Sequence, residues 1–310
     1  TPCGTLFPYT TLFRSRKSVF PRSASAGCNT VMKLTGLGLV KTTLIDFPGE
    51  VAAAVFTPGC NLRCPYCHNP ELVQPPYPDT LISLQEIFTF LQKRASVLGA
   101  VCITGGEPLL YAASADDKSA EPAGDIFELI SCCKSLGLKV KLDTNGCFPE
   151  RLRPFLSIAD EFSAGGADAA DSGDARRNLL DFIAMDIKTL PEKYAAVSGA
   201  AAETARTAAA VRKSIEYIVR SGVPHEFRTT MAPGIAGTEE AIEIARLLQS
   251  VYSAAGRDPA EAGSYILTQF RGGNTLDPGF SFLRPPFAEE LRETAAQVRS
   301  FGLFCKVRGI

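Results

Sequence analysis

The stretch Cys60–Pro70 reads CNLRCPYCHNP and places Cys60, Cys64 and Cys67 at the spacing C-x3-C-x2-C. It follows a short apolar run, VAAAVF at residues 51–56, so we expect it to be a loop after a buried strand. Cysteine thiolates at close spacing are soft ligands for zinc or iron–sulfur clusters. Because no fourth ligand is evident, the stretch predicts a metal centre with one open coordination position, the feature that separates catalytic from structural zinc sites.

Length and composition set broad limits. A chain of 310 residues is long enough for one large α/β domain or two small ones, and 45% hydrophobic with 21% charged residues is typical of soluble globular proteins. No apolar run approaches the roughly 18 residues that span a bilayer, and a formal net charge of −1 gives no sign of a nucleic-acid surface. Ten cysteines are too dilute for a disulfide scaffold. We therefore expect a cytoplasmic protein with neither membrane nor nucleic-acid partners.

Residues 1–31 are expected to lie outside the folded domain, which we place at 32–310. They hold four Arg or Lys residues and no acid, and PYTTLFRS at 8–15 reads like a translated sequencing-adapter oligonucleotide. A basic targeting peptide is the alternative, but the stretch lacks an apolar core or an amphipathic pattern. A non-native or disordered extension is the preferred interpretation. Without it, 28 basic residues (32 minus 4) face 33 acidic ones, a net charge of −5.

From Lys33 onward, short β-rich runs alternate with helical stretches. After 51–56, strands are expected at residues 100–104, 139–143, 182–187, 226–230, 265–270 and 304–307. Helices are expected at residues 83–98, 125–136, 203–220, 238–252 and 287–300, with a short one from residue 149. About six strand–helix units indicate a parallel sheet with crossover helices, although periodicity alone does not separate an open doubly wound sheet from a partial barrel. The Ala-, Gly-, Asp- and Ser-rich stretch 163–178 is interpreted as a loop insertion.

Distinctive polar residues follow the expected strands. The carboxyl ends of parallel strands meet at one rim, in open sheets and in barrels, so we expect these residues to lie close together. In chain order they are the three cysteines, GGEP at 105–108, Asp143, TNG at 144–146, Asp186 and Lys188, Arg228, and Gln269.

Several of these residues have plainer interpretations. GGEP could be a strand-ending turn, although two glycines let a ligand approach the backbone and Glu107 could accept hydrogen bonds from an ammonium group. The pair Asp186 and Lys188 could be a solvated strand end, and Arg228 could simply pair with an acid. A structural zinc site completed by His68 or by a distant cysteine is chemically reasonable. Against it, a ligand directly beside Cys67 would be strained, and the usual second pair of ligands at similar spacing is missing.

The pattern C-x3-C-x-aromatic-C, with Tyr66 in the aromatic position, resembles the signature of radical S-adenosylmethionine (radical SAM) enzymes. This resemblance implies one [4Fe–4S] cluster held by three thiolates, with SAM chelating the fourth iron. It also implies that one electron from the cluster cleaves SAM to a 5′-deoxyadenosyl radical, which abstracts hydrogen from a substrate. No catalytic residue beyond the cluster and SAM is expected. The implied fold is a partial (β/α)6 barrel with parallel strands and outer helices.

The same resemblance assigns cofactor-binding roles to the strand ends. GGEP resembles the motif that holds the SAM amino group, and Asp186-Ile187-Lys188 resembles an Asp-x-Lys that contacts the SAM ribose and carboxylate. The implied iron ligands are Cys60, Cys64 and Cys67. The candidate SAM-binding residues are Tyr66, His68, Gly105, Gly106, Glu107, Asp143, Asn145, Asp186, Lys188, Arg228 and Gln269.

Three further segments narrow the resemblance: TLIDFPG at 43–49, CPYCHNPELV at 64–73 and QFRGGN at 269–274. They resemble the activating proteins of anaerobic ribonucleoside-triphosphate reductase. That likeness implies a glycyl-radical enzyme as partner, on which a glycyl radical is formed, and a flavodoxin-like or other low-potential electron donor. Two alternatives stay open: a radical SAM enzyme acting on a small molecule, such as a modified-nucleoside precursor, and a zinc-stabilised interaction protein.

Overall fold

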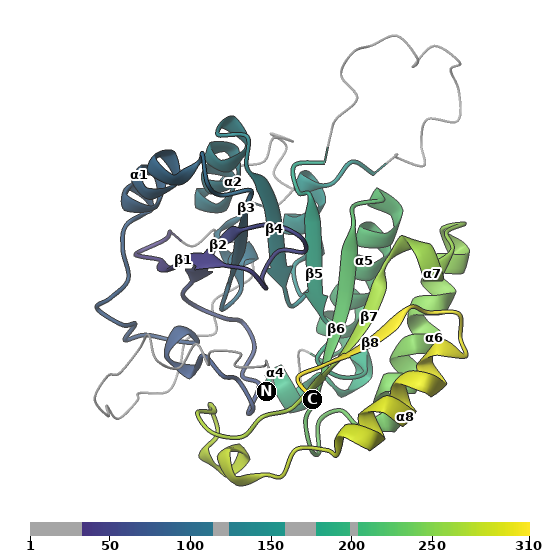
Figure 1. The fold of residues 1–310 in the computed structure, drawn as a ribbon. Helices are drawn as coiled ribbons and strands as arrows, with labels where there is room; N and C mark the ends of the chain where they lie inside the picture. Colours follow the sequence, from purple (N-terminus) through teal and green to yellow (C-terminus); the bar gives the residue numbers. More distant parts are fainter. Residues whose placement is uncertain (1–32, 114–123, 159–177, 199–203) are drawn as a thin grey trace, which may run out of the picture.

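A computed structural model describes residues 33–113, 124–158, 178–198 and 204–310. Its eight strands form one sheet in sequence order, as Figure 1 shows. The first, β1 (Gly38–Thr43), is antiparallel to its neighbour, and all other pairs are parallel. The parallel strands are β2 (Ala52–Thr57), β3 (Ala100–Gly105), β4 (Lys139–Thr144), β5 (Phe182–Asp186), β6 (His225–Met231), β7 (Ser264–Gln269) and β8 (Cys305–Arg308).

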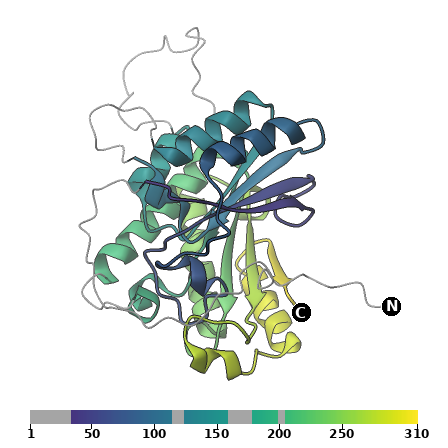
Figure 2. The ribbon, with the colours of Figure 1, turned by 90° about the vertical axis from the view of Figure 1, so that its left-hand side faces the viewer.

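Helices follow six of the parallel strands, so the predicted partial (β/α)6 fold is confirmed. They are α1 (Leu84–Arg94), α2 (Asp125–Ser135), the short α3 (Pro149–Leu152), α5 (Thr204–Ser221), α6 (Thr238–Ala254) and α8 (Ala288–Arg299), with single turns at α4 (Ala195–Ser198) and α7 (Pro259–Ala262). Ser83 and Glu86 form the capping box at the start of α1 that the sequence predicts. In Figure 2 the helices coloured blue to green lie to one side of the strands.

The strand alternation gives the sheet an outer face under the helices and an inner face opposite. Outer-face side chains are apolar and buried against the helices, for example Val101, Ile103, Val140, Leu142, Ile183, Met185, Phe227, Tyr265 and Leu267. The alternate positions of the same strands carry charge on the inner face: Lys141, Asp143, Asp186, Glu226, Arg228, Lys306 and Arg308. Because successive side chains of a strand point to opposite faces, one run of residues builds both the core and a polar surface.

The hairpin loop between β1 and β2 packs on the inner face. Phe47 is 5% exposed and contacts Phe182, with ring centroids 6.2 Å apart. The Nζ of Lys141 donates a hydrogen bond to the carbonyl oxygen of Asp46 at 2.7 Å. The strand β1 was not among those expected from the sequence, because most of its side chains are half-buried or exposed and the apolar alternation is weak.

Two expectations from the sequence concern segments that the structure does not describe. The extension at 1–31, and the loop insertion at 163–178 apart from Asn178, lie outside the described residues. Among the described helices, none has the length and apolar character that a membrane crossing requires.

Candidate active site at the carboxyl ends of the strands

A cavity of about 250 Å³ opens where β2 to β6 end. All three cysteines of the C-x3-C-x2-C stretch line it, together with residues from the ends of four further strands. The lining residues are Cys60, Leu62, Cys64, Tyr66, Cys67, His68, Asn69, Val73, Thr104, Gly105, Gly106, Asp143, Thr144, Asn145, Asp186, Lys188, Arg228 and Thr230. The predicted meeting of strand-end residues at one rim is therefore seen for most of the candidates.

Backbone hydrogen bonds hold the cysteine loop, Cys60–Pro70, on two sides. On one side the amide of Cys60 donates to the carbonyl of Val73 at 3.1 Å. On the other, the amides of Leu276 and Asp277 donate to the carbonyls of Cys67 and Pro65 at 3.2 and 2.9 Å. The loop is thus pinned between the segment that leaves it and the segment that follows β7. This fixes where the three sulfurs stand before any ligand binds.

The surroundings of the three cysteines, of which Cys64 is buried and the other two are half-buried, disfavour the ionised thiolate. Burial raises the pKa of Cys60 to about 12 and that of Cys64 to about 11, where the cation of Lys188 opposes the effect. Burial also raises the pKa of Cys67. Binding to iron would therefore displace a proton from each sulfur, as it does for thiol ligands in general.

The donor set fits an iron–sulfur cluster. Three soft sulfurs, from one loop, line one wall of a cavity large enough for further atoms. Within the described residues, no three Cys, His, Asp or Glu side chains converge closely enough to hold a single metal ion. A cluster makes a weaker demand, because each thiolate binds its own iron and the sulfurs need not point at a common centre.

The two glycines of GGEP are needed for backbone packing. Gly105 has a φ of +115°, and a Cβ on Gly106 would lie 1.9 Å from the carbonyl oxygen of Gly59. The amide of Gly106 donates to the carbonyl of Thr57, and that of Glu107 to the carbonyl of Gly59, both at 2.8 Å. The glycines therefore let the end of β3 lie directly against the start of the cysteine loop, while both still line the cavity.

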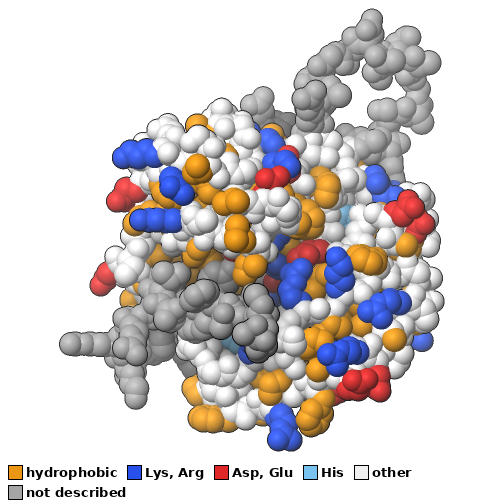
Figure 3. Space-filling view, viewed as in Figure 1, with side chains coloured by type: hydrophobic (Ala, Val, Ile, Leu, Met, Phe, Trp, Pro, Cys, Tyr) orange, Lys and Arg blue, Asp and Glu red, His pale blue; other side chains and the backbone are white. Residues whose placement is uncertain are grey.

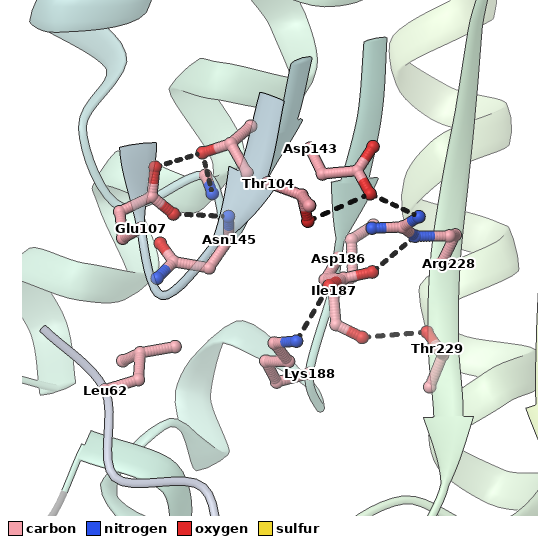
Figure 4. A network of polar contacts seen from close by, with 12 residues as sticks. Leu62, Thr104, Glu107, Asp143, Asn145, Asp186, Ile187, Lys188, Arg228 and Thr229 are labelled. Carbon is pink, nitrogen blue, oxygen red and sulfur yellow. Dashed lines mark hydrogen bonds and ion pairs between the residues drawn. The ribbon is translucent and has the colours of Figure 1, made fainter. Parts of the chain in front are cut away.

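Glu107 is fully buried and is not part of the cavity lining. Its carboxylate accepts hydrogen bonds from the amide of Leu109 at 3.1 Å and from the hydroxyl of Thr144 at 2.8 Å. It also accepts one from the amide of Asn145 at 2.7 Å (Figure 4). Burial raises its pKa to about 7, although these donors oppose the shift. In this structure Glu107 ties the ends of β3 and β4 together, and its contact with the SAM amino group stays a prediction.

Charged side chains form a chain across β4, β5 and β6. Arg228 lies between two carboxylates, with Nε 2.6 Å from Asp186 and Nη1 3.1 Å from Asp143 (Figure 4). Lys188 Nζ is 2.8 Å from the other oxygen of Asp186, and Lys141 Nζ is 3.0 Å from Asp143. Burial alone would raise the pKa of Asp186, but Arg228 and Lys188 hold it well below the usual range. Both carboxylates therefore stay ionised and fix the cations that face the cavity.

An asparagine pair connects this rim to the cysteine loop. The side-chain amide of Asn145 donates to the Oδ1 of Asn61 at 2.8 Å and lies 3.9 Å from the Cys60 sulfur. Its own Oδ1 accepts the amide of Cys147 at 3.0 Å. The TNG turn is thus more than a tight turn, because it supplies a donor to one of the thiols.

Not every predicted residue reaches the cavity. Gln269 is outside the lining, and its side chain donates to the carbonyl of Pro286 at 2.9 Å. His68 lines the cavity and stacks on Phe270, with centroids 6.4 Å apart. Lys141, which pairs with Asp143, was not among the site residues predicted from the sequence. The signal was present, since residues two apart on a strand share a face.

The fold and this cavity define a parallel α/β enzyme whose site gathers thiols, carboxylates and cations at the carboxyl ends of the strands. A model of the radical SAM superfamily matches residues 54–248, and the chain belongs to this family. Members of the family use a [4Fe–4S] cluster and SAM. The predicted cofactors are thereby confirmed at the level of the family.

The chain resembles several named proteins. It is 27% identical over 262 residues, 84% of this chain and 90% of the relative, to a Methanocaldococcus jannaschii protein named as a glycyl-radical enzyme activating enzyme. It is 30% identical over 156 residues to the pyruvate formate-lyase-activating enzyme of Listeria monocytogenes, covering 48% of this chain and 52% of that one. It is 32% identical over 138 residues to the 7-carboxy-7-deazaguanine synthase of Methanopyrus kandleri, covering 38% and 50%.

Solved structures support the fold. Streptococcus suis SuiB bound to S-adenosylmethionine aligns with a TM-score of 0.52 at 14% identity, over 81% of this chain and 48% of that one. A radical SAM methyltransferase from Sphaerobacter thermophilus aligns with a TM-score of 0.52 at 12% identity, over 88% and 77%. The chain thus spans about half of SuiB, and at these identities the likeness concerns the fold alone.

Proposed function

We propose that this radical SAM enzyme generates a glycyl radical on a partner enzyme, with Cys60, Cys64 and Cys67 as ligands of its [4Fe–4S] cluster. The observation that carries the cluster assignment is that all three thiols line one cavity together with Lys188 and Arg228. When bound, the cluster and SAM together supply the hydrogen-abstracting radical from which the superfamily takes its name.

The chain's own residues bind and orient. Lys188 presents a half-buried ammonium group to the cavity and is held by Asp186, a pair suited to a ligand with a carboxylate and ribose hydroxyls. Arg228 keeps both neighbouring carboxylates ionised. Glu107, through three hydrogen bonds, keeps the GGEP and TNG turns in register with each other. Tyr66 and Leu62, both nearly fully buried, close the cavity against water on the side of the cysteine loop.

Relatives named as activating enzymes support a protein substrate, and the M. jannaschii relative matches over most of both chains. The finer proposal is that the partner is an anaerobic ribonucleotide reductase, supported by the TLIDFPG, CPYCHNPELV and QFRGGN segments. A flavodoxin-like or other low-potential protein is proposed as the electron donor.

The surface beside the cavity suits a protein partner. On the face seen in Figure 3, Lys and Arg side chains gather over β6 to β8. Lys306 on β8 is exposed, and its Nζ lies 4.8 Å from the ring centroid of Phe304. Phe282, at 90% exposure, sits on the loop whose backbone is hydrogen-bonded to the cysteine loop. Exposed aromatic side chains such as Phe282 are enriched in protein interfaces, and surface charges such as that of Lys306 speed association with a partner of opposite charge.

Metal analysis tests the cluster assignment. Protein purified without oxygen is expected to bind iron and sulfide at one [4Fe–4S] cluster per chain, and Cys64→Ala should lose it. Cys132→Ala is the matched control, because Cys132 is a half-buried thiol on α2 that does not line the cavity. Stoichiometric zinc with neither iron nor sulfide in the wild type would contradict the assignment.

Electron paramagnetic resonance tests the substrate. Incubation of the loaded enzyme with the reductase, SAM and a reductant should give a glycyl-radical doublet. Lys306→Glu should weaken activation of the reductase while leaving uncoupled 5′-deoxyadenosine formation unchanged, and the exposed Lys93→Glu on α1 serves as the control. A full cluster without any doublet would count against a glycyl-radical partner.

A small-molecule substrate is the second candidate, and likeness to 7-carboxy-7-deazaguanine synthases favours it. In that case a small-molecule precursor of a modified nucleoside, rather than the reductase, should stimulate 5′-deoxyadenosine formation. The Lys306→Glu variant should then be as active as the wild type. The two candidates therefore predict opposite outcomes with the same set of proteins.

A further inference from the structure

The hydroxyl of Tyr66 is an exception among the buried tyrosines. The side chain is 4% exposed and lines the cavity, and its oxygen has no hydrogen-bond partner within the described structure. Four other buried tyrosines are all paired: Tyr111 with the carbonyl of Pro58, Tyr194 with the amide of Lys188, Tyr252 with His225 and Tyr265 with Thr229. A buried polar group without a partner is rare in native proteins and calls for an explanation, such as a ligand.

The three sulfurs differ in the hydrogen bonds that reach them. The sulfur of Cys60 receives the amide of Leu62 at 3.4 Å and lies 3.9 Å from the side-chain amide of Asn145. The backbone amide of Asn69 lies close enough to Cys67 to lower the pKa of its thiol. Within the described residues, no hydrogen bond to the sulfur of Cys64 or of Cys67 is formed. The Tyr66 phenol nevertheless lies close enough to lower the pKa of the Cys64 thiol, although without the geometry of a formed hydrogen bond.

We propose that the Tyr66 hydroxyl donates a hydrogen bond to the Cys64 sulfur when that sulfur is an iron-bound thiolate, and that this bond raises the reduction potential of the cluster. The proposal rests on the cluster assignment made above. Hydrogen bonds to a charged acceptor, such as an iron-bound thiolate, are shorter and stronger than those to a neutral thiol, which is a weak acceptor. Hydrogen bonds to the sulfurs are one of the factors that set the potential of an iron–sulfur cluster.

This role gives Tyr66→Phe two effects of different kinds. In the cluster-free protein the substitution removes an unsatisfied buried hydroxyl, so the stability should be unchanged or higher. In the loaded protein it removes a donor that favours the more negative, reduced cluster. The reduction potential should therefore become more negative, with the reduced-to-oxidised ratio at a fixed potential falling about threefold or more.

The experiment is a potentiometric titration of the cluster, followed by electron paramagnetic resonance, on wild-type and Tyr66→Phe protein without SAM or partner. Potential does not depend on the amount of cluster, so partial loading of the variant does not obscure the result. Urea unfolding of the cluster-free proteins is measured in parallel. Tyr265→Phe is the matched control, because it removes a paired hydroxyl on the outer face and should lower stability while leaving the potential unchanged.

Two results would overturn the proposal. One is a Tyr66→Phe potential equal to that of the wild type. The other is a cluster-free Tyr66→Phe protein destabilised as much as Tyr265→Phe, since the hydroxyl would then have a structural partner. Neither result depends on the substrate. A cluster with the expected shift but no glycyl radical on the reductase would contradict the proposed function alone.

Discussion

Phe227 and Arg228 are neighbours on β6, and they belong to different parts of the protein. Phe227 lies on the outer face, fully buried, with its ring 5.1 Å from that of His225 and 6.4 Å from that of Tyr252. Arg228 lies on the inner face between Asp143 and Asp186 and lines the cavity. The same contrast holds along β4. Leu142 belongs to the core under the helices, whereas Asp143 belongs to the row of paired charged side chains on the inner face.

The comparison shows how this chain separates stability from chemistry. The outer face is mostly apolar, so it can exchange one apolar residue for another of similar volume at small cost. The inner face is a set of mutually paired charges, in which each residue fixes the position of the next. Removing a member of that set should therefore alter both the fold and the site, whereas a change on the outer face should alter the fold alone.

The largest effect on stability is expected for Phe227→Ala. Truncating a fully buried phenylalanine leaves a cavity beneath α6, and the free energy of unfolding should fall by about 4 kcal/mol. The rate of 5′-deoxyadenosine formation per cluster should stay close to the wild-type rate in protein that remains folded. Urea unfolding and product analysis check the two parts. A large loss of activity in folded protein would show that the two faces are coupled.

Arg228→Met should destabilise by about 3 kcal/mol, because Asp186 and Asp143 each lose a half-buried cationic partner. The decrease in the free energy of unfolding is smaller than for Phe227→Ala, because water in the cavity can solvate the carboxylates of Asp186 and Asp143 once Arg228 is removed. Unlike the outer-face variant, it should reduce 5′-deoxyadenosine formation per cluster at least tenfold, since Asp186 and Lys188 lose their fixed orientation. Activity equal to that of Phe227→Ala in the same assay would remove the distinction between the faces.

The sequence predicted the elements more fully than the contacts. Strand and helix positions followed from apolar periodicity, and the rule that parallel strands end at one rim brought Cys60, Asn145, Asp186 and Arg228 together correctly. The sequence could not show that Glu107 accepts hydrogen bonds from the neighbouring TNG turn, because a carboxylate after two glycines is equally suited to a ligand and to a backbone amide. The hydrogen-bond partner of a side chain at a strand end depends on which groups of the adjacent strand lie next to it, and the sequence does not give this.

His225 makes one part of the outer face sensitive to pH. Burial lowers its pKa to about 4, and its ring nitrogens interact with the carbonyl of Val223 and the hydroxyl of Tyr252, with Arg257 opposing a positive charge nearby. Because the folded pKa lies below the usual value of 6.5, the unfolded chain binds the proton more readily. Above about pH 6.5 the free energy of unfolding does not depend on the titration of His225. As the pH falls from there toward 4, proton binding to the unfolded chain lowers the free energy of unfolding.

The loss due to His225 should reach about 2 kcal/mol at pH 5 relative to pH 7. Urea unfolding at both values, for the wild type and His225→Phe, isolates the contribution as the difference in their pH dependence. Between pH 7 and pH 5, the free energy of unfolding of His225→Phe should fall by about 2 kcal/mol less than that of the wild type, whatever the stability of the variant at pH 7. Parallel decreases for the two proteins would place the acid sensitivity elsewhere, for example among the inner-face carboxylates.

The smallest effects are expected for two lysines of β4 that share the inner face but differ in depth. Lys139 is exposed and pairs with Glu50 at the amino end of the strand, and Lys141 is 4% exposed, with Asp143 and the carbonyl of Asp46 as partners. Lys139→Met should leave the unfolding midpoint unchanged within error, because exposed ion pairs contribute little. Lys141→Met should lower the free energy of unfolding by about 1 kcal/mol, since Asp143 keeps Arg228 while the Asp46 carbonyl loses its donor. Urea unfolding of the two variants side by side measures the difference. Equal effects would mean that the inner face is solvated along its whole length, and that its charges act as separate surface groups rather than as a connected set.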